Sequence, residues 1–194
     1  MRRLVKTRLA SSTVLAMAAG ISGHAKAALI FTFQEQGSDV VATGSGSVDL
    51  AGLSRSGEDI LSASGVSAQN GVAGVAGTVA VYTGIAGPDS FGPGGPVVAS
   101  SGGGDAVAIN GSDGFLGVPL GYVSGAALSS SMEFVGQTFA SIGLTPGKYV
   151  WNWGSGVNAD SFTVQIGPRA IPEPASMLAV GAGLLGLRAV RRHR

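Results

Sequence analysis

The sequence contains no cysteine, and its two histidines, His24 and His193, lie close to the ends of the chain. Without cysteine there is neither a disulfide framework nor a thiol nucleophile. Without histidine, the central part of the chain lacks the base of the serine and cysteine hydrolase triads and the nitrogen ligand of most zinc sites. Carboxylate chemistry remains, either glycoside hydrolysis by two acids or Ca²⁺ binding by oxygen ligands. Neither has a signature in the sequence, so we predict no metal and no cofactor there.

Basic residues are also scarce in the middle of the chain. The whole sequence has 12 Lys and Arg against 11 Asp and Glu. Between Ala28 and Pro174, however, the bases are only Arg55, Lys148 and Arg169, whereas all 11 acids lie there, giving a net charge of about −8. Nucleic-acid binding needs clustered bases that displace counterions from phosphates. We therefore exclude nucleic acid as a partner and expect the charge to keep this region soluble.

The apolar run near the C-terminus is short for a membrane span. Ala175 to Leu187 is 13 residues without a charge. A helix of that length covers roughly 20 Å, less than the hydrocarbon core of roughly 30 Å. Extension to Val190, with Arg188 reaching to the interface, makes it a marginal anchor. The basic residues of the end would stay in the cytoplasm and leave everything before the run outside. These residues are Arg188, Arg191, Arg192 and Arg194.

Pro172, Glu173 and Pro174 directly precede this run. The two prolines cannot continue a helix and favour an extended Glu173, so we expect an accessible strip at the membrane surface. The order of Pro-Glu-Pro, short apolar helix and arginine cluster resembles the PEP-CTERM sorting signal of exported proteins of Gram-negative bacteria. The resemblance implies recognition by an exosortase, a membrane transpeptidase, processing near the motif with removal of the tail, and a producer of exopolysaccharide or biofilm. The alternative is a plain C-terminal anchor.

The N-terminus has the three parts of a secretory signal peptide. A basic stretch precedes an apolar segment from Leu9 to Ile21, and Ala25-Lys26-Ala27 fits the small-x-small cleavage pattern. Cleavage after Ala27 would leave Ala28 as the mature N-terminus. Arg2-Arg3 raises the twin-arginine route, but the following residues fit it poorly, so we favour general secretion. A retained N-terminal anchor is the alternative.

These two ends divide the chain into three predicted segments. Residues 1–27 are a signal peptide, 28–170 an exported acidic domain and 171–194 the sorting signal with its short transmembrane helix. The middle segment carries most of the 33 glycines, which argues against helices and for many turns. We predict an all-β, antiparallel sandwich or jelly-roll-like domain.

Short alternating or apolar runs mark the expected strands. They are 29–35, 39–43, 48–53, 78–83, 106–110, 131–135, 148–153 and 161–166. Leu144 to Gly147 predicts a type II turn before a hairpin closed by residues 154–160. Gly71 to Gly77 is interpreted as a small-residue loop or a flexible strand, and Gly87 to Gly104 as a long, mobile surface loop.

The best local candidate for binding is a row of aromatic residues. In a strand, Tyr149, Trp151 and Trp153 point to one face, where they could stack on sugar rings. The other interpretation is that they are the largest core residues of a chain with few aromatics. Their burial distinguishes the two. Asn110 and Asp113 lack the closing acid of a calcium loop, so a turn is favoured there.

The function expected from the sequence is that of a secreted surface or matrix protein. Its partners would be signal peptidase and the secretion machinery, an exosortase, the inner membrane as a transient anchor, and extracellular polysaccharide. We expect the β domain to be structural or adhesive and not an enzyme. The alternatives are a carboxylate-dependent polysaccharide hydrolase, which needs two facing acids, and a glycan- or ice-binding module, which needs a flat exposed face.

Overall fold

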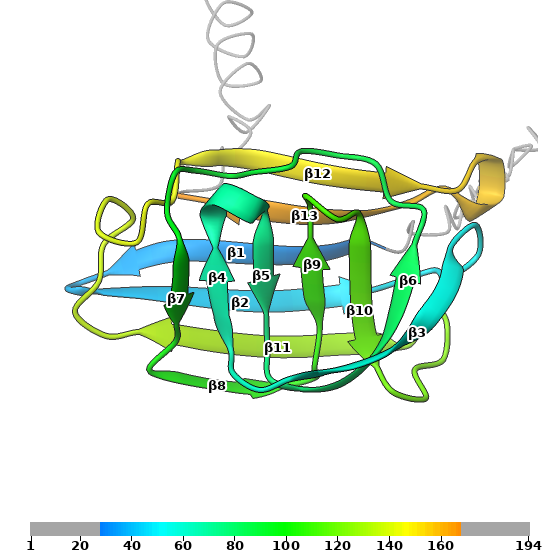
Figure 1. Cartoon of the computed structure of the whole chain (residues 1–194), viewed down its shortest axis with the longest axis horizontal. Coiled ribbons are helices and arrows are strands. Elements are labelled where there is room, and N and C mark those ends of the chain that lie inside the picture. Colours follow the sequence, from blue (N-terminus) through cyan, green and yellow to red (C-terminus); the bar gives the residue numbers. More distant parts are fainter. Residues whose placement is uncertain (1–27, 168–194) are drawn as a thin grey trace, which may run out of the picture.

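The computed structural model describes residues 28–167, which form thirteen β-strands and two short 3-10 helices (Figure 1). The strands make two sheets that pack face to face. In Figure 1 the strands of the front sheet run across those of the sheet behind, which is the orthogonal kind of sandwich. The all-β prediction is confirmed. The helices expected at both ends lie outside the described residues.

The six-stranded sheet has the order β12-β13-β1-β2-β11-β8. Its strands are β1 (Ala28–Gln36), β2 (Asp39–Ser47), β8 (Ser101–Gly104), β11 (Ala127–Phe134), β12 (Gly147–Trp153) and β13 (Asp160–Ile166). Its pairs are antiparallel except β1 and β13, which run parallel from Ala28 opposite Ser161 to Phe33 opposite Ile166. The predicted hairpin of β12 and β13 is present. The first and the last strand of residues 28–167 are thus neighbours within this sheet.

The seven-stranded sheet has the order β3-β6-β10-β9-β5-β4-β7. Its strands are β3 (Ser54–Leu61), β4 (Gly65–Ser67), β5 (Val72–Gly74), β6 (Gly77–Thr83), β7 (Pro96–Val98), β9 (Ala108–Asn110) and β10 (Phe115–Pro119). The 3-10 helix η1 (Ala68–Asn70) joins β4 to β5, and η2 (Gly156–Asn158) lies between β12 and β13. Only two residues separate β7 from β8, so the chain turns a corner from one sheet into the other there.

The core lies between the sheets and is rich in aromatic rings. Phe31 of β1 and Phe162 of β13, which lie diagonally across this strand pair, stack with ring centroids 5.5 Å apart. Trp151 packs edge-on against Phe162 at 6.2 Å. All three are at most 1% exposed. Alternation in β1 directs Leu29, Phe31 and Phe33 inward, which is why this strand could be predicted.

The segment from Gly84 to Gly95 crosses from β6 to β7 along the outer edge of β12 (Figure 1). Ala86 and Asn152 exchange two backbone hydrogen bonds of 2.8 and 2.9 Å. Phe91 is 1% exposed, and its backbone groups are bonded to Ala68 and Thr145. The prediction of a mobile loop over Gly87 to Gly104 is therefore wrong, because the segment is fastened by a buried ring and also contains β7 and β8.

The structure also decides three smaller predictions. Val48–Leu53 is not a strand, since it forms a turn after β2 with Val48 fully buried. The type II turn at Leu144 to Gly147 is wrong, because Gly147 does not have positive φ and is the first residue of β12, paired with Ile166. Of the two interpretations of Gly71 to Gly77, the strand is correct for Val72–Gly74.

Candidate binding surface

The aromatic row of β12 points into the sandwich. Trp151 is 1% and Trp153 4% exposed, and Tyr149 is half-buried. Trp151 Nε1 donates to the carbonyl of Pro88 at 3.0 Å, and Trp153 Nε1 to that of Asp49 at 2.7 Å. The Tyr149 hydroxyl donates to the carbonyl of Thr145 at 3.0 Å.

The hypothesis of a glycan-stacking platform at Tyr149, Trp151 and Trp153 is therefore wrong for the two tryptophans. A ring that stacks on a sugar must expose its face to solvent, whereas both indole faces are covered by core side chains and both N–H groups are already bonded. Tyr149 alone keeps partial exposure, and its ring packs against Phe91 at 5.9 Å. The row belongs to the core.

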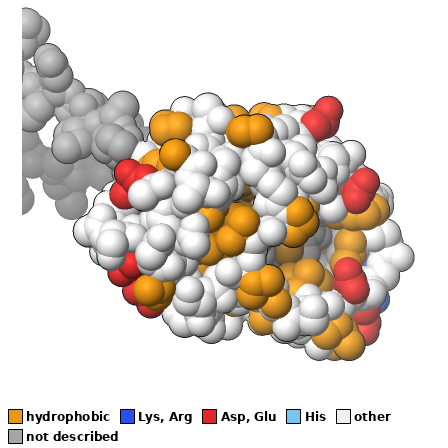
Figure 2. All heavy atoms as spheres, turned by 60° about the vertical axis from the view of Figure 1, so that its left-hand side comes forward, with side chains coloured by type: hydrophobic (Ala, Val, Ile, Leu, Met, Phe, Trp, Pro, Cys, Tyr) orange, Lys and Arg blue, Asp and Glu red, His pale blue; other side chains and the backbone are white. Residues whose placement is uncertain are grey.

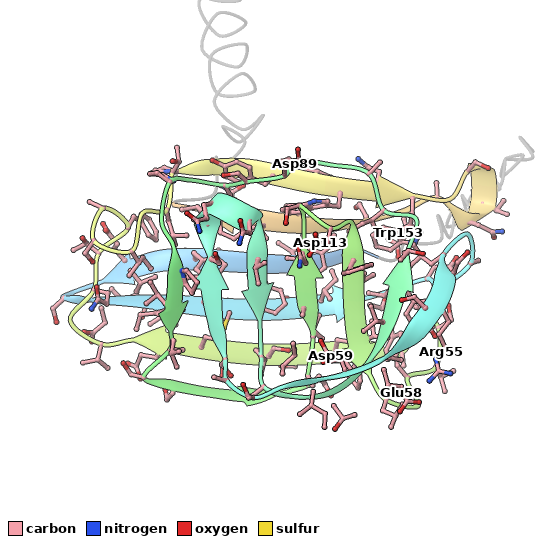
Figure 3. The ribbon with its side chains drawn as sticks, viewed as in Figure 1. Arg55, Glu58, Asp59, Asp89, Asp113 and Trp153 are labelled. Atoms are coloured by element: carbon pink, nitrogen blue, oxygen red, sulfur yellow. The ribbon has the colours of Figure 1, made fainter. Side chains whose placement is uncertain are left out.

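The acidic residues are dispersed over the described surface. Figure 3 shows Glu58 and Asp59, which are neighbours on β3, away from Asp89 and Asp113. Among residues 28–167 no group of three or more His, Cys, Asp or Glu side chains could hold a metal ion. Asn110 and Asp113 form a local turn in which the Asn110 side chain accepts the backbone N–H of Asp113 at 3.2 Å and donates to its carboxylate at 2.9 Å.

Asp160, at the start of β13, is the acid that the structure buries, with 6% exposure. Its two carboxylate oxygens accept the backbone N–H groups of Asp49 and Ser161, both at 2.6 Å. Burial raises the pKa of Asp160, against the lowering effect of these hydrogen bonds, and the nearby Asp49 adds to the rise. The sequence did not indicate that Asp160 is buried, because the acids are scattered along it without a pattern.

Tyr122 fastens the turn that follows β2. Its hydroxyl accepts the N–H of Val48 at 2.9 Å and donates to the carbonyl of Ala126 at 2.6 Å. Burial raises the pKa of Tyr122, and the charges of Asp160 and Asp105 add to the rise. This bonded tyrosine explains why Val48–Leu53, although apolar, caps the end of the sandwich instead of extending a strand.

The outer face of the seven-stranded sheet carries a hollow with a floor of small residues. Gly65, Gly74, Ala108 and Gly117 lie opposite one another on β4, β5, β9 and β10. Residues at paired positions share a face of the sheet, so they form one row across four strands. Three of the four have no side chain, which lowers the surface along this row.

The rows on either side form the walls. Ser67, Val72, Asn110 and Phe115 are paired in the same way, two residues further along each strand. Leu61, Val79 and Asp59 lie on the other side. Two adjoining hollows of about 310 and 120 Å³ share Leu61, Val72 and Ala108, so they form one groove.

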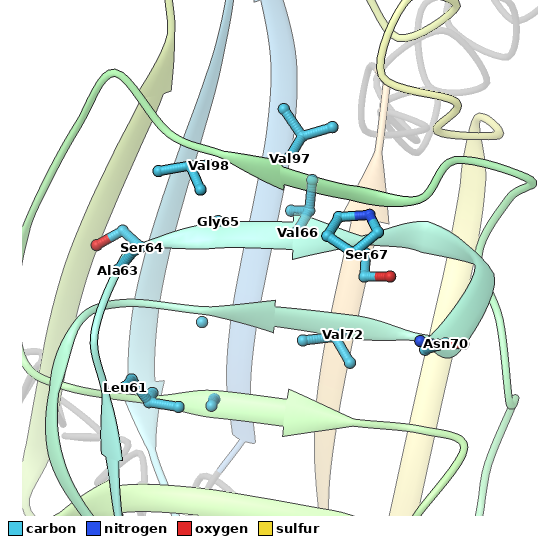
Figure 4. Close-up of a pocket in the computed structure, with 13 residues that line it drawn as sticks. Leu61, Ala63, Ser64, Gly65, Val66, Ser67, Asn70, Val72, Val97 and Val98 are labelled. Atoms are coloured by element: carbon cyan, nitrogen blue, oxygen red, sulfur yellow. The ribbon is translucent and has the colours of Figure 1, made fainter.

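The groove walls are mainly apolar. Figure 4 shows Leu61, Val72 and Val98 around the larger hollow, and Figure 2 shows hydrophobic side chains around a hollowed part of the face that it displays. Ser67 is 6% exposed, and its hydroxyl has no hydrogen-bond partner among residues 28–167. The sequence did not point to this groove, because it depends on which strands are neighbours.

The residues predicted for processing lie outside the described part of the chain. They are Ala25 and Ala27 of the signal peptidase site, Pro172, Glu173 and Pro174 of the sorting motif, and Arg188, Arg191, Arg192 and Arg194 of the cytoplasmic anchor. The predicted transmembrane helix also lies there. Within residues 28–167, no helix has the length and apolar character to cross a membrane.

Comparison with known proteins identifies the C-terminal segment. Residues 170–194 match the family model of the PEP-CTERM protein-sorting motif. This confirms the resemblance drawn from the Pro-Glu-Pro motif, the apolar run and the arginine cluster. The motif implies export toward the cell envelope and an exosortase as the processing partner. No curated protein and no solved structure matches the chain.

Proposed function

We propose that this chain is the precursor of a surface or extracellular-matrix protein. An exosortase processes it near the Pro-Glu-Pro motif and removes the tail. The β domain serves a structural or adhesive role beside exopolysaccharide. The single observation that carries the proposal is the sorting motif at residues 170–194. The signal-peptide pattern of residues 1–27 supports it independently, since a sorting motif of this kind acts only on an exported chain.

The β domain has a core and a surface charge that suit a soluble exported protein. It holds together without disulfides, around a core of aromatic and aliphatic side chains. Its net charge of about −8 keeps the domain soluble and away from anionic surfaces. Figure 2 shows several acidic side chains on the displayed face and almost no basic ones.

Substitution of the sorting motif tests the proposal. Pro172→Ala, Glu173→Gln and Pro174→Ala together should leave the tail attached and hold the protein in the membrane fraction. Pro168→Ala is the matched control, because it removes a proline four residues before the motif. Intact mass and cell fractionation give the readout. A triple variant with the wild-type mature mass and the wild-type release would refute exosortase processing at this motif.

The groove on the seven-stranded sheet favours a second candidate, a binding module for a neutral glycan. Its lining combines apolar side chains with the amides of Asn70 and Asn110 and includes the exposed ring of Phe115. Apolar surface with a few polar groups is the usual lining of a small-molecule site. The acidic surface opposes anionic polysaccharides, so we propose an uncharged chain as the ligand.

Filling the groove floor tests this candidate. Ala108→Leu places an isobutyl group in the middle of the groove, while Val157→Leu, on the fully exposed helix η2, is the control. We expect retention on immobilised neutral glycans for the wild type and the control, and loss for Ala108→Leu. A glycan array on which the wild type binds nothing would remove the candidate.

We propose binding rather than catalysis for the β domain. A polysaccharide hydrolase needs two carboxyl groups roughly 5 to 10 Å apart on either side of the sugar. The two parts of the groove are lined by one acid, Asp59, and the cavity at the start of β13 by one, Asp160. Hydrolysis of exopolysaccharide by the purified protein, lost in Asp59→Asn, would overturn this proposal.

A further inference from the structure

Ala28, the predicted mature N-terminus, and the buried Asp160 line the same cavity. Ala28 begins β1, Asp160 begins β13, and the parallel pairing places Ala28 opposite Ser161. The cavity has a volume of about 210 Å³ and is also lined by Asn152 and Trp153. The backbone nitrogen of Ala28 is therefore at the same end of the six-stranded sheet as the Asp160 carboxylate.

Within residues 28–167, the Asp160 carboxylate has hydrogen-bond donors but no cationic partner. Its two partners are the backbone N–H groups of Asp49 and Ser161, and the nearby side chain of Asp49 is itself an acid. The basic residues among 28–167 are Arg55 and Lys148. Arg55 pairs with Glu58 on β3, and Lys148 lies opposite Gln165, near the other end of β13. Burial of a carboxylate without a cationic partner lowers the stability of the folded state.

We propose that the α-ammonium group formed on Ala28 by removal of residues 1–27 enters this cavity and is the cation that pairs with Asp160. The inference rests on the export step of the proposed function and on cleavage after Ala27. In the precursor, Ala28 contributes a neutral amide to the same place. Cleavage by signal peptidase replaces this amide with a positive charge, so processing completes the charge balance of the fold.

The pKa of the new α-amine tests the pairing. An ordinary α-amino group has a pKa of about 7.7 to 8.0, and an opposite charge within about 4 to 6 Å shifts a pKa by about 1 to 3 units. The exported, processed protein should therefore show an α-amine that titrates at least about one unit higher in the native state than in urea. The measurement is the pH profile of α-amine acetylation, followed by mass spectrometry. At pH 7 this corresponds to roughly tenfold slower acetylation of the native amine.

Two variants separate the ion pair from simple burial of the amine. Asp160→Asn should bring the titration midpoint back to the ordinary value, whereas the exposed Asp113→Asn should keep the wild-type midpoint. Lys148, the single lysine between Ala28 and Pro174, is an internal reference for reagent activity. If Asp160→Asn does not fold, the comparison of native and urea-unfolded wild type decides alone.

The outcomes also separate this inference from the proposed function. A native α-amine with an ordinary midpoint overturns the pairing and leaves sorting untouched. An intact mass that corresponds to an N-terminus other than Ala28 overturns the pairing as well. The same spectrum reports independently whether the tail was removed.

Discussion

Trp151 should be among the largest single contributors to the stability of the β domain, and Trp151→Ala is the perturbation that measures it. The indole is 1% exposed, packs on Phe162, and holds the crossover segment through its bond to the carbonyl of Pro88. Truncation of a buried tryptophan to alanine costs about 3 to 5 kcal/mol. For a domain of this size, about 3 °C is lost per kcal/mol, so the melting temperature should fall by about 9 to 15 °C.

Trp151→Phe isolates the hydrogen bond, because it keeps an aromatic ring against Phe162 but leaves the Pro88 carbonyl without its donor. We expect a loss of about 1 to 3 kcal/mol. Val157→Ala, at a side chain that is 98% exposed, is the control and should change stability by less than about 0.5 kcal/mol. Thermal unfolding followed by circular dichroism measures all three.

The assay also distinguishes core from surface roles for this aromatic row. A sugar platform would lose glycan binding on Trp151→Ala and keep its melting temperature. Because Trp151 is buried, we expect Trp151→Ala to lower the melting temperature instead. The wild-type emission of the two tryptophans should also be blue-shifted and poorly quenched by acrylamide, since both are buried. A melting temperature lowered by less than about 2 °C in Trp151→Ala would refute the packing argument.

Two further predictions concern polar groups of the core margin. Since the pKa of Tyr122 is raised in the folded state, its stabilising contribution is complete below the ordinary tyrosine pKa and is lost as pH rises through the folded value. Alkaline unfolding should therefore begin above about pH 10. In absorbance at 295 nm, the late titration of Tyr122 should be missing from Tyr122→Phe. The Ser67 hydroxyl is buried without a partner among the described residues, so Ser67→Ala should leave the free energy of unfolding unchanged or raise it by about 1 kcal/mol. Ser130→Ala, which removes a bond of 2.7 Å to the Asp105 carbonyl, should lower it by a similar amount in chemical denaturation, and equal losses in both serine variants would contradict the reasoning.

The strands that could be predicted from the sequence are those with one buried face. From Phe162 to Ile166 in β13, apolar residues alternate with polar ones, and in β1 buried residues alternate with partly exposed ones, because one face meets the opposite sheet. β3 was missed because it is an edge strand whose residues are almost all exposed, with Arg55, Glu58 and Asp59 along it. Charges on an edge strand discourage pairing with other chains and also erase the alternation that identifies a strand.

The candidate binding surface could not be predicted, because it arises from the pairing of strands. Gly65, Gly74 and Gly117 are far apart in sequence and form a row only because β4, β5, β9 and β10 are arranged in register. From the sequence, the glycines as a group indicated many turns, and Gly74 belonged to a stretch interpreted as a small-residue loop or a flexible strand. The sorting motif could be predicted for the opposite reason, since its three parts are contiguous in the chain and depend on no tertiary contact.

The parallel pairing of β1 with β13 fixes the order in which the sheet can be assembled. β13 lies between β12 and β1, so β1 cannot complete its pairing until β13 is present. The paired residues Ala28 and Ser161 are 133 positions apart in the sequence. Contacts that distant in sequence form slowly. In an exported chain, the six-stranded sheet therefore stays open until Ile166 has crossed the membrane, when only five residues remain before Pro172. Completion of the fold and arrival of the sorting motif at the membrane thus fall at nearly the same moment of translocation.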